Sequence, residues 1–142
     1  MMILKIQILA IGILSLIACD SQSNVKPINF DKNKDFSILE LKRTADYSSS
    51  DKDTLACEHW KLTKTELKNI VFESKPINNR EWHYDFAHLP CEIQGKLLQS
   101  KIEYPFTVNG GGWIKIVSVD SIYTLGNYKN ENDRYFLTTA WQ

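Results

Sequence analysis

The sequence predicts an α+β fold, in which an antiparallel sheet of about five strands carries one helix on one face. Strict alternation of apolar and polar residues over residues 101–108 is typical of a strand. The Asn-Gly-Gly-Gly run 109–112 predicts a hairpin turn, because Asn and Gly tolerate positive φ. The β-branched run 113–119 after this turn indicates a central strand. One amphipathic helix after Thr63 can cover such a sheet and close its core.

The first half of the predicted domain contains a strand, a loop and this helix. Residues 36–43 predict a strand, and residues 44–53 are a loop by composition. Thr63 and Glu66 have the spacing of a capping box, in which hydroxyl and carboxylate each satisfy a free backbone N–H. Apolar residues then recur at i, i+3 and i+4, and they are Leu67, Ile70 and Val71. Pro76 ends the helix by residue 75.

The second half is predicted to be mainly strands. Segment 81–91 alternates three aromatic residues with His83 and Asp85, which predicts a short strand with an aromatic face. Residues 91–99 and 101–108 predict two more strands. Pro105 cannot donate to a strand ladder, which favours an edge strand or a bulge. The remaining expectations are a polar loop over residues 126–134 and a closing strand over residues 135–141.

The N-terminal residues have the pattern of a signal peptide. Lys5 is the only charge before Asp20, and residues 6–18 are almost entirely apolar. At about 1.5 Å per residue they would make a helix of roughly 20 Å, which is short for a bilayer core of about 30 Å. An uncleaved anchor or a buried helix is the alternative to a signal peptide.

Residues 16–19, Leu-Ile-Ala-Cys, resemble the lipobox of bacterial lipoproteins. The resemblance implies that the Cys19 thiol receives a diacylglycerol, that residues 1–18 are removed, and that the new amino group is often acylated. Two or more acyl chains hold a protein stably on a membrane. Asp20 resembles the residue that favours retention at the inner membrane. The implied organisation is a signal peptide over 1–18, a lipidated tether over 19–35 and a single domain over 36–142. Val25, Ile28 and Phe30 are apolar, and docking of part of the tether on the domain through them is the alternative to a fully extended tether.

The chain has three cysteines, an odd number for an oxidising compartment. Lipidation of Cys19 would leave Cys57 and Cys91 as a pair, which we expect to be a disulfide outside the cytoplasm. The chain-entropy relation gives such a loop roughly 3–4 kcal/mol of stabilisation. A metal or redox pair is the alternative, but the sequence has no CxxC spacing.

The charge balance argues against a nucleic-acid partner. The whole chain has a formal net charge of zero, and loss of the segment containing Lys5 would leave it near −1. A nucleic-acid-binding surface needs a basic field. No cofactor is expected.

The histidines are the first candidates for a chemical site. They could form a metal site with nearby carboxylates, although their spacing matches no metal signature; this set is His59, His83, His88, Glu58, Glu81 and Asp85. On a strand, His83 and Asp85 would share a face and could form a general-base pair. Ordinary surface histidines are the default interpretation. No GxSxG motif surrounds any serine.

A binding surface is the second candidate. Gly110, Gly111 and Gly112 could offer N–H groups to an anion, although a hairpin turn is favoured. The chain has four Trp and six Tyr, and aromatic residues are enriched at the centres of interfaces. Trp113 and Trp141 are the tryptophans expected to be exposed.

Together these features favour a non-catalytic, lipid-anchored binding module on the extracytoplasmic side of a bacterial membrane. Its expected partners are the membrane itself and another envelope protein or component, as for accessory or immunity lipoproteins. A small envelope hydrolase that uses the region of His83 and Asp85 is one alternative. A structural component of the envelope is the other.

Overall fold

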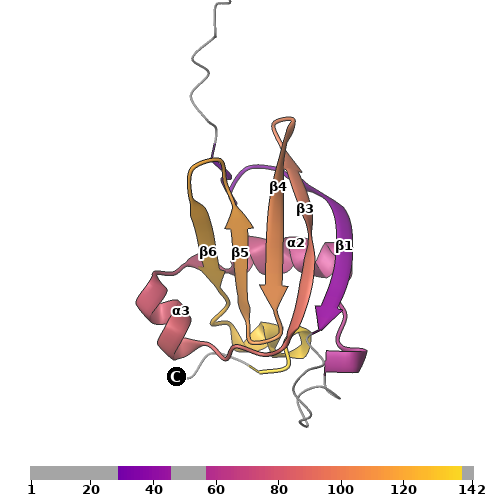
Figure 1. The fold of residues 1–142 in the computed structure, drawn as a ribbon, viewed down its shortest axis with the longest axis vertical. Coiled ribbons are helices and arrows are strands. Elements are labelled where there is room, and N and C mark those ends of the chain that lie inside the picture. Colours follow the sequence, from indigo (N-terminus) through magenta and orange to yellow (C-terminus); the bar gives the residue numbers. More distant parts are fainter. Residues whose placement is uncertain (1–28, 46–56, 139–142) are drawn as a thin grey trace, which may run out of the picture.

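The computed structural model describes residues 29–45 and 57–138, which form one antiparallel sheet with helices around it (Figure 1). The sheet has six strands in the order β1-β3-β4-β5-β6-β2. Their bounds are β1 Ser37–Ala45, β2 Lys75–Pro76, β3 Cys91–Gln99, β4 Ile102–Asn109, β5 Trp113–Val117 and β6 Ile122–Gly126. The predicted α+β class is confirmed, with six strands instead of about five. The expectations for Cys19, Asp20 and Trp141 lie outside the described residues.

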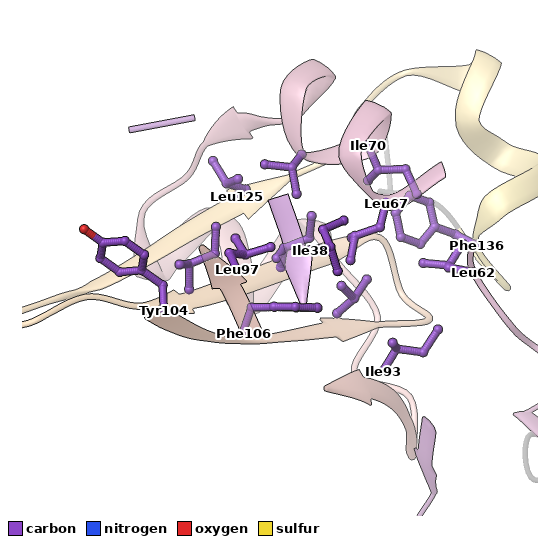
Figure 2. Packing of buried hydrophobic residues seen from close by; sticks show 14 of the residues in the cluster. Ile38, Leu62, Leu67, Ile70, Ile93, Leu97, Tyr104, Phe106, Leu125 and Phe136 are labelled. Atoms are coloured by element: carbon purple, nitrogen blue, oxygen red, sulfur yellow. The ribbon is translucent and has the colours of Figure 1, made fainter. Parts of the chain in front are cut away.

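Helix α2 (Lys64–Glu73) begins where the capping box predicts. The Thr63 side chain accepts a hydrogen bond from the Glu66 N–H at 3.2 Å, and the Glu66 carboxylate accepts one from the Thr63 N–H at 2.8 Å. The helix crosses behind the strands in Figure 1. Its buried residues Leu67, Ile70 and Val71 belong to the main core. Figure 2 shows this core, where side chains of the helix meet those of the sheet.

The predicted disulfide is confirmed between Cys57 and Cys91. Both side chains are fully buried in the main core. Cys57 belongs to a short helical segment ahead of α2, and Cys91 is the first residue of β3. The bond therefore ties the chain before α2 to the start of β3, the strand next to edge strand β1.

Residues 29–35, expected to be tether, are packed on the domain. Phe30 is buried among the rings of Phe36 and Tyr104, with centroid distances of 5.4 and 5.6 Å. The buried side chain of Gln99 accepts a hydrogen bond from the Asp31 N–H and donates one to the Asp31 carbonyl. These contacts fix the start of the described chain to the sheet.

One strand expectation near the C-terminus was wrong, and the central strand expected over 113–119 is confirmed as β5 with a shorter end. The expected closing strand is absent from residues 135–138, because Asn130–Tyr135 is a 3-10 helix and residues 136–138 form bends. Phe136 packs into the main core from there, and the Trp60 indole N–H donates to the Tyr135 carbonyl. The run 113–119 ends as a strand at Val117, and β6 begins after a short turn.

Pro105 does not mark an edge strand. Strand β4 lies inside the sheet, between β3 and β5. Pro105 pairs with Lys96 of β3, while the ladder to β5 begins one residue later at Phe106. The proline is therefore tolerated because it lies just beyond the β4–β5 ladder. The register shift lies in β1, between Ile38 and Glu40.

Candidate functional site: an aromatic surface on helix α3

Segment 79–85 is a helix, so the predicted strand with an aromatic face was wrong. Helix α3 (Asn79–Asp85) begins at an Asn78 cap, whose side chain accepts hydrogen bonds from the Arg80 and Glu81 N–H groups at 2.9 and 3.0 Å. The Glu81 carboxylate accepts one in return from the Asn78 N–H at 2.8 Å. This is the same capping box that starts α2, and Asn78 with Glu81 was the signal that sequence reasoning missed.

The helix separates His83 from Asp85. Each residue of an α-helix turns about 100° around the helix axis, so residues two apart are separated by a turn of about 200°. The side chains of His83 and Asp85 therefore do not share a face. Asp85 instead accepts a hydrogen bond from the Tyr128 hydroxyl at 2.8 Å. The general-base pair, which depended on a strand, loses its geometric basis.

None of the residues of helix α3 is fully buried. The residues that follow the helix therefore attach it to the domain. At its C-terminal end Phe86 is buried, with its ring 4.9 Å from the ring of Tyr128 and against Gly126. The Lys75 ammonium lies 3.9 Å from the Tyr128 ring centroid. Partial burial and the hydrogen bond to Asp85 raise the pKa of the Tyr128 hydroxyl. The hydroxyl therefore remains a donor to Asp85 well into the alkaline range.

Trp113 is buried, in contrast to the expectation that it is exposed. Its side chain is 4% exposed, and its indole N–H donates to the Ala87 carbonyl at 3.0 Å. Trp113 starts β5 outside the main core cluster, and the chain between α3 and β3 packs over it. Tertiary packing of this connection decides the burial, and the residues next to Trp113 in the sequence do not specify it.

The three turn glycines are also buried. Their N–H groups donate to the Cys91 carbonyl, the Asn109 side chain and the Asn109 carbonyl. A Cβ on Gly111 would lie 1.9 Å from the Ala87 carbonyl oxygen, and Gly112 has a φ of 92°. The glycines therefore form the favoured turn and allow the close approach of a neighbouring segment, and their N–H groups are already used within the chain.

Asn109 organises this region, and sequence reasoning did not single it out. Its side chain is buried, accepts a hydrogen bond from the Leu89 N–H at 3.1 Å and donates one to the Leu89 carbonyl at 2.8 Å. It thus pairs with the connection after α3 as a strand would. An Asn at the end of a strand and before glycines is the signal that could have identified it.

Four aromatic rings of α3 and the segment after it contact one another in a row, and we call them the α3 surface: Trp82, His83, Tyr84 and His88. Trp82 packs edge-on against His88 and Trp113, with centroid distances of 4.4 and 5.5 Å. His83 and His88 are exposed, and Tyr84 is 69% exposed. The His88 Nε2 lies 3.1 Å from the Trp82 carbonyl oxygen, and this hydrogen bond holds the His88 ring against Trp82.

One cation lies against this surface. The Lys115 ammonium of β5 is 3.5 Å from the Trp82 ring centroid and 5.4 Å from that of Trp113. Such a contact stabilises the ring position and leaves a positive charge beside the aromatic side chains. The Trp82 indole N–H has no hydrogen-bond acceptor among the described residues. The arrangement is suited to apolar and cation–π contacts with another macromolecule.

Across residues 29–45 and 57–138, no three His, Cys, Asp or Glu side chains are grouped so that they could hold a metal ion. Within the same residues, no helix is long and apolar enough to cross a membrane.

No protein family, curated protein or solved structure matches this chain.

Proposed function

We propose that this protein is a lipid-anchored binding module on the extracytoplasmic side of a bacterial membrane, which binds another envelope protein through the α3 surface. The observation that carries the proposal is the exposure of fixed aromatic side chains on α3. The helix buries none of its residues, yet hydrogen bonds at both its ends hold it in place. Rigid aromatic side chains bind partners at little cost in conformational entropy.

The Cys57–Cys91 disulfide supports the location. Disulfides persist in the periplasm and at cell surfaces and are rare in the cytoplasm. With two of the three cysteines paired, Cys19 of the lipobox is left as the thiol for acylation. Asp20 favours the inner membrane within this proposal.

The chemistry of the surface favours a protein partner. Exposed Tyr84, His83 and His88 supply aromatic area, and Lys115 adds one positive charge beside Trp82. Interfaces are enriched in aromatic side chains and depleted of charge at their centres. An accessory or immunity role fits a module of this kind.

The anchor is tested by the intact mass of the protein purified from native membranes, measured with and without reduction before thiol alkylation. We expect a chain that begins at Cys19, is heavier by two or three acyl groups, and shows alkylated Cys57 and Cys91 only after reduction. An unprocessed chain with free thiols would refute the location.

The binding surface is tested by photo-cross-linking in living cells. A photoreactive amino acid at Tyr84 is expected to give a defined adduct, and one at Gln94, on the exposed polar side of β3, is the matched control. The adduct should weaken when Trp82→Ala and His88→Ala are added. Equal adducts from both positions, or an adduct insensitive to these substitutions, would contradict binding through α3.

A further inference from the structure

The hairpin between β5 and β6 exposes three apolar side chains, which we call the hairpin tip: Val117, Val119 and Ile122. Their exposed fractions are 46%, 63% and 61%. Val117 and Ile122 are register partners, so they lie side by side on one face of the hairpin. A cluster of exposed apolar side chains on one short hairpin indicates a contact surface.

This hairpin lies where the chain enters the domain. The Ser118 hydroxyl donates to the Asn29 side chain at 2.8 Å and accepts a hydrogen bond from the Phe30 N–H at 3.3 Å. Ser118 and Phe30 are both buried, so the start of the described chain is fixed to the hairpin. Figure 1 shows the β5–β6 turn at the end of the sheet where the chain begins, with α3 toward the other end.

Only residues 20–28 separate Cys19 from this attachment point. A chain of this length averages about 17 Å as a coil and reaches at most about 35 Å. An acylated Cys19 would hold the hairpin tip within that distance of the bilayer. The acyl anchor would make the contact between the hairpin tip and the bilayer intramolecular. Even a weak affinity of the tip for lipid would then keep the tip bound.

The charges at this end of the domain are balanced. Acidic and basic side chains are equal in number in the turns around the hairpin: Asp31, Asp35, Asp120, Lys32, Lys34 and Lys101. Among the described residues, this end of the domain therefore has no polybasic patch for anionic headgroups. Its affinity for a membrane depends on the apolar side chains.

From these observations we infer that the hairpin tip inserts into the interfacial region of the bilayer that holds the lipid anchor. The inference rests on the proposed acylation of Cys19. Insertion at two points, the acyl chains and the tip, orients the domain, with its sheet end on the membrane and the α3 surface directed toward the aqueous compartment. The occupant of the tip is a phospholipid surface, and neutral phosphatidylcholine suffices.

The test uses the full chain purified from membranes and reconstituted in phosphatidylcholine vesicles that contain a lipid with a nitroxide near the headgroup. A solvent-sensitive dye is attached at Ser121→Cys in the turn, and at Arg80→Cys on α3 as the control. We expect the nitroxide to quench the dye at position 121 several-fold more than the dye at position 80. Adding Val119→Ser and Ile122→Ser should remove this difference. Tyr84→Ser, which removes an equally exposed ring from α3, should preserve it.

The mass of the same preparation separates the two proposals. Equal quenching at positions 121 and 80 in an acylated chain overturns insertion of the tip and leaves the anchor intact. A chain without acyl groups overturns the anchor and the inference that rests on it. If Val119→Ser with Ile122→Ser halves the mass of the detergent-solubilised particle, the tip joins two copies of the chain and the inference is wrong.

Discussion

Helices α2 and α3 begin with the same capping box and differ in the residues that come after it. In α2 the box of Thr63 and Glu66 precedes a stripe of three buried apolar residues. In α3 the box of Asn78 and Glu81 precedes aromatic and charged residues, none of them fully buried. The first helix closes the main core, and the second is held by its flanks against the sheet.

The comparison separates two sources of helix stability. A cap satisfies free N–H groups at a helix start and contributes about 1 kcal/mol, whereas burial of an apolar side chain contributes more. Helix α2 has both contributions. Helix α3 depends on its cap, the buried Phe86 and the Trp113–Ala87 hydrogen bond, so its own side chains remain exposed or half-buried.

The largest expected effect is on the buried stripe of α2. Leu67→Ala removes a fully buried side chain and should lower the free energy of unfolding by about 2–5 kcal/mol. Tyr84→Ala removes an exposed side chain of α3 and should change it by less than about 0.5 kcal/mol. Urea denaturation with the disulfide intact measures both. Similar losses in the free energy of unfolding of the two variants would contradict the distinction between α2, which packs in the core, and α3, whose residues are exposed or half-buried.

A smaller effect is expected where α3 leads into the sheet. Gly111→Ala places a methyl group against the Ala87 carbonyl oxygen and should cost about 1–3 kcal/mol. Amide exchange in residues 79–88 should accelerate, because Ala87 also accepts the bond from Trp113. Gly110→Ala is the matched control, since its new methyl would meet the ends of flexible Leu137 and Leu89 side chains. An equal loss from both alanines would show that the close approach at Gly111 is unimportant.

The two caps give a closer comparison. Thr63→Ala and Asn78→Ala each remove the side-chain acceptor of a capping box and should each cost about 0.5–2 kcal/mol. For Thr63 the loss should appear in global unfolding, because α2 belongs to the main core. For Asn78 it should appear mainly as faster amide exchange within α3, which can open locally. Hydrogen exchange followed by mass spectrometry distinguishes the two, and exchange in α3 that requires global unfolding would contradict the prediction.

The smallest effect concerns the hydrogen bond between Tyr128 and Asp85. Tyr128→Phe should cost at most about 1.5 kcal/mol at neutral pH. The folded state raises the pKa of Tyr128 above its ordinary value of 10.0, so the unfolded chain loses this proton first and stability falls as pH rises above 10. The variant should therefore show a shallower fall, by at most about 1.4 kcal/mol per pH unit. Parallel stability curves for the two proteins between pH 9 and 11 would refute the shift.

Most of the fold was predictable because its signals are local. The alternation in β4, the glycine turn and the box at Thr63 each depend on neighbouring residues, and each element was found. The α3 segment was misassigned because Trp82, Tyr84 and Phe86 alternate like strand residues, and the weaker signal from Asn78 and Glu81 was overlooked. The C-terminal expectation failed for a different reason, since Phe136 is buried from the end of a 3-10 helix and needs no strand.

The candidate site was less predictable than the fold. Trp113 and the three glycines were proposed as surface, but the connection after α3 covers them. Whether a ring is exposed depends on a segment that crosses it, and no local pattern encodes that crossing. His83 remained exposed, and its useful neighbours are Tyr84 and His88 instead of Asp85.

The sequence by itself determined the α+β class, the capped core helix and the hairpin turn, because caps, turns and periodicity are properties of short range. The pairing of Cys57 with Cys91 was implied by the lipobox resemblance, which assigns Cys19 to lipidation and leaves these two cysteines as a pair. Only the tertiary structure decided which aromatic residues are presented, that His83 and Asp85 do not face each other, and that the chain enters the domain beside an exposed apolar hairpin. These features depend on contacts between segments far apart in the chain, such as Ser118 with Asn29 and Trp113 with Ala87. Long-range packing sets such contacts, and the residues adjacent in sequence to the contacting residues do not specify this packing.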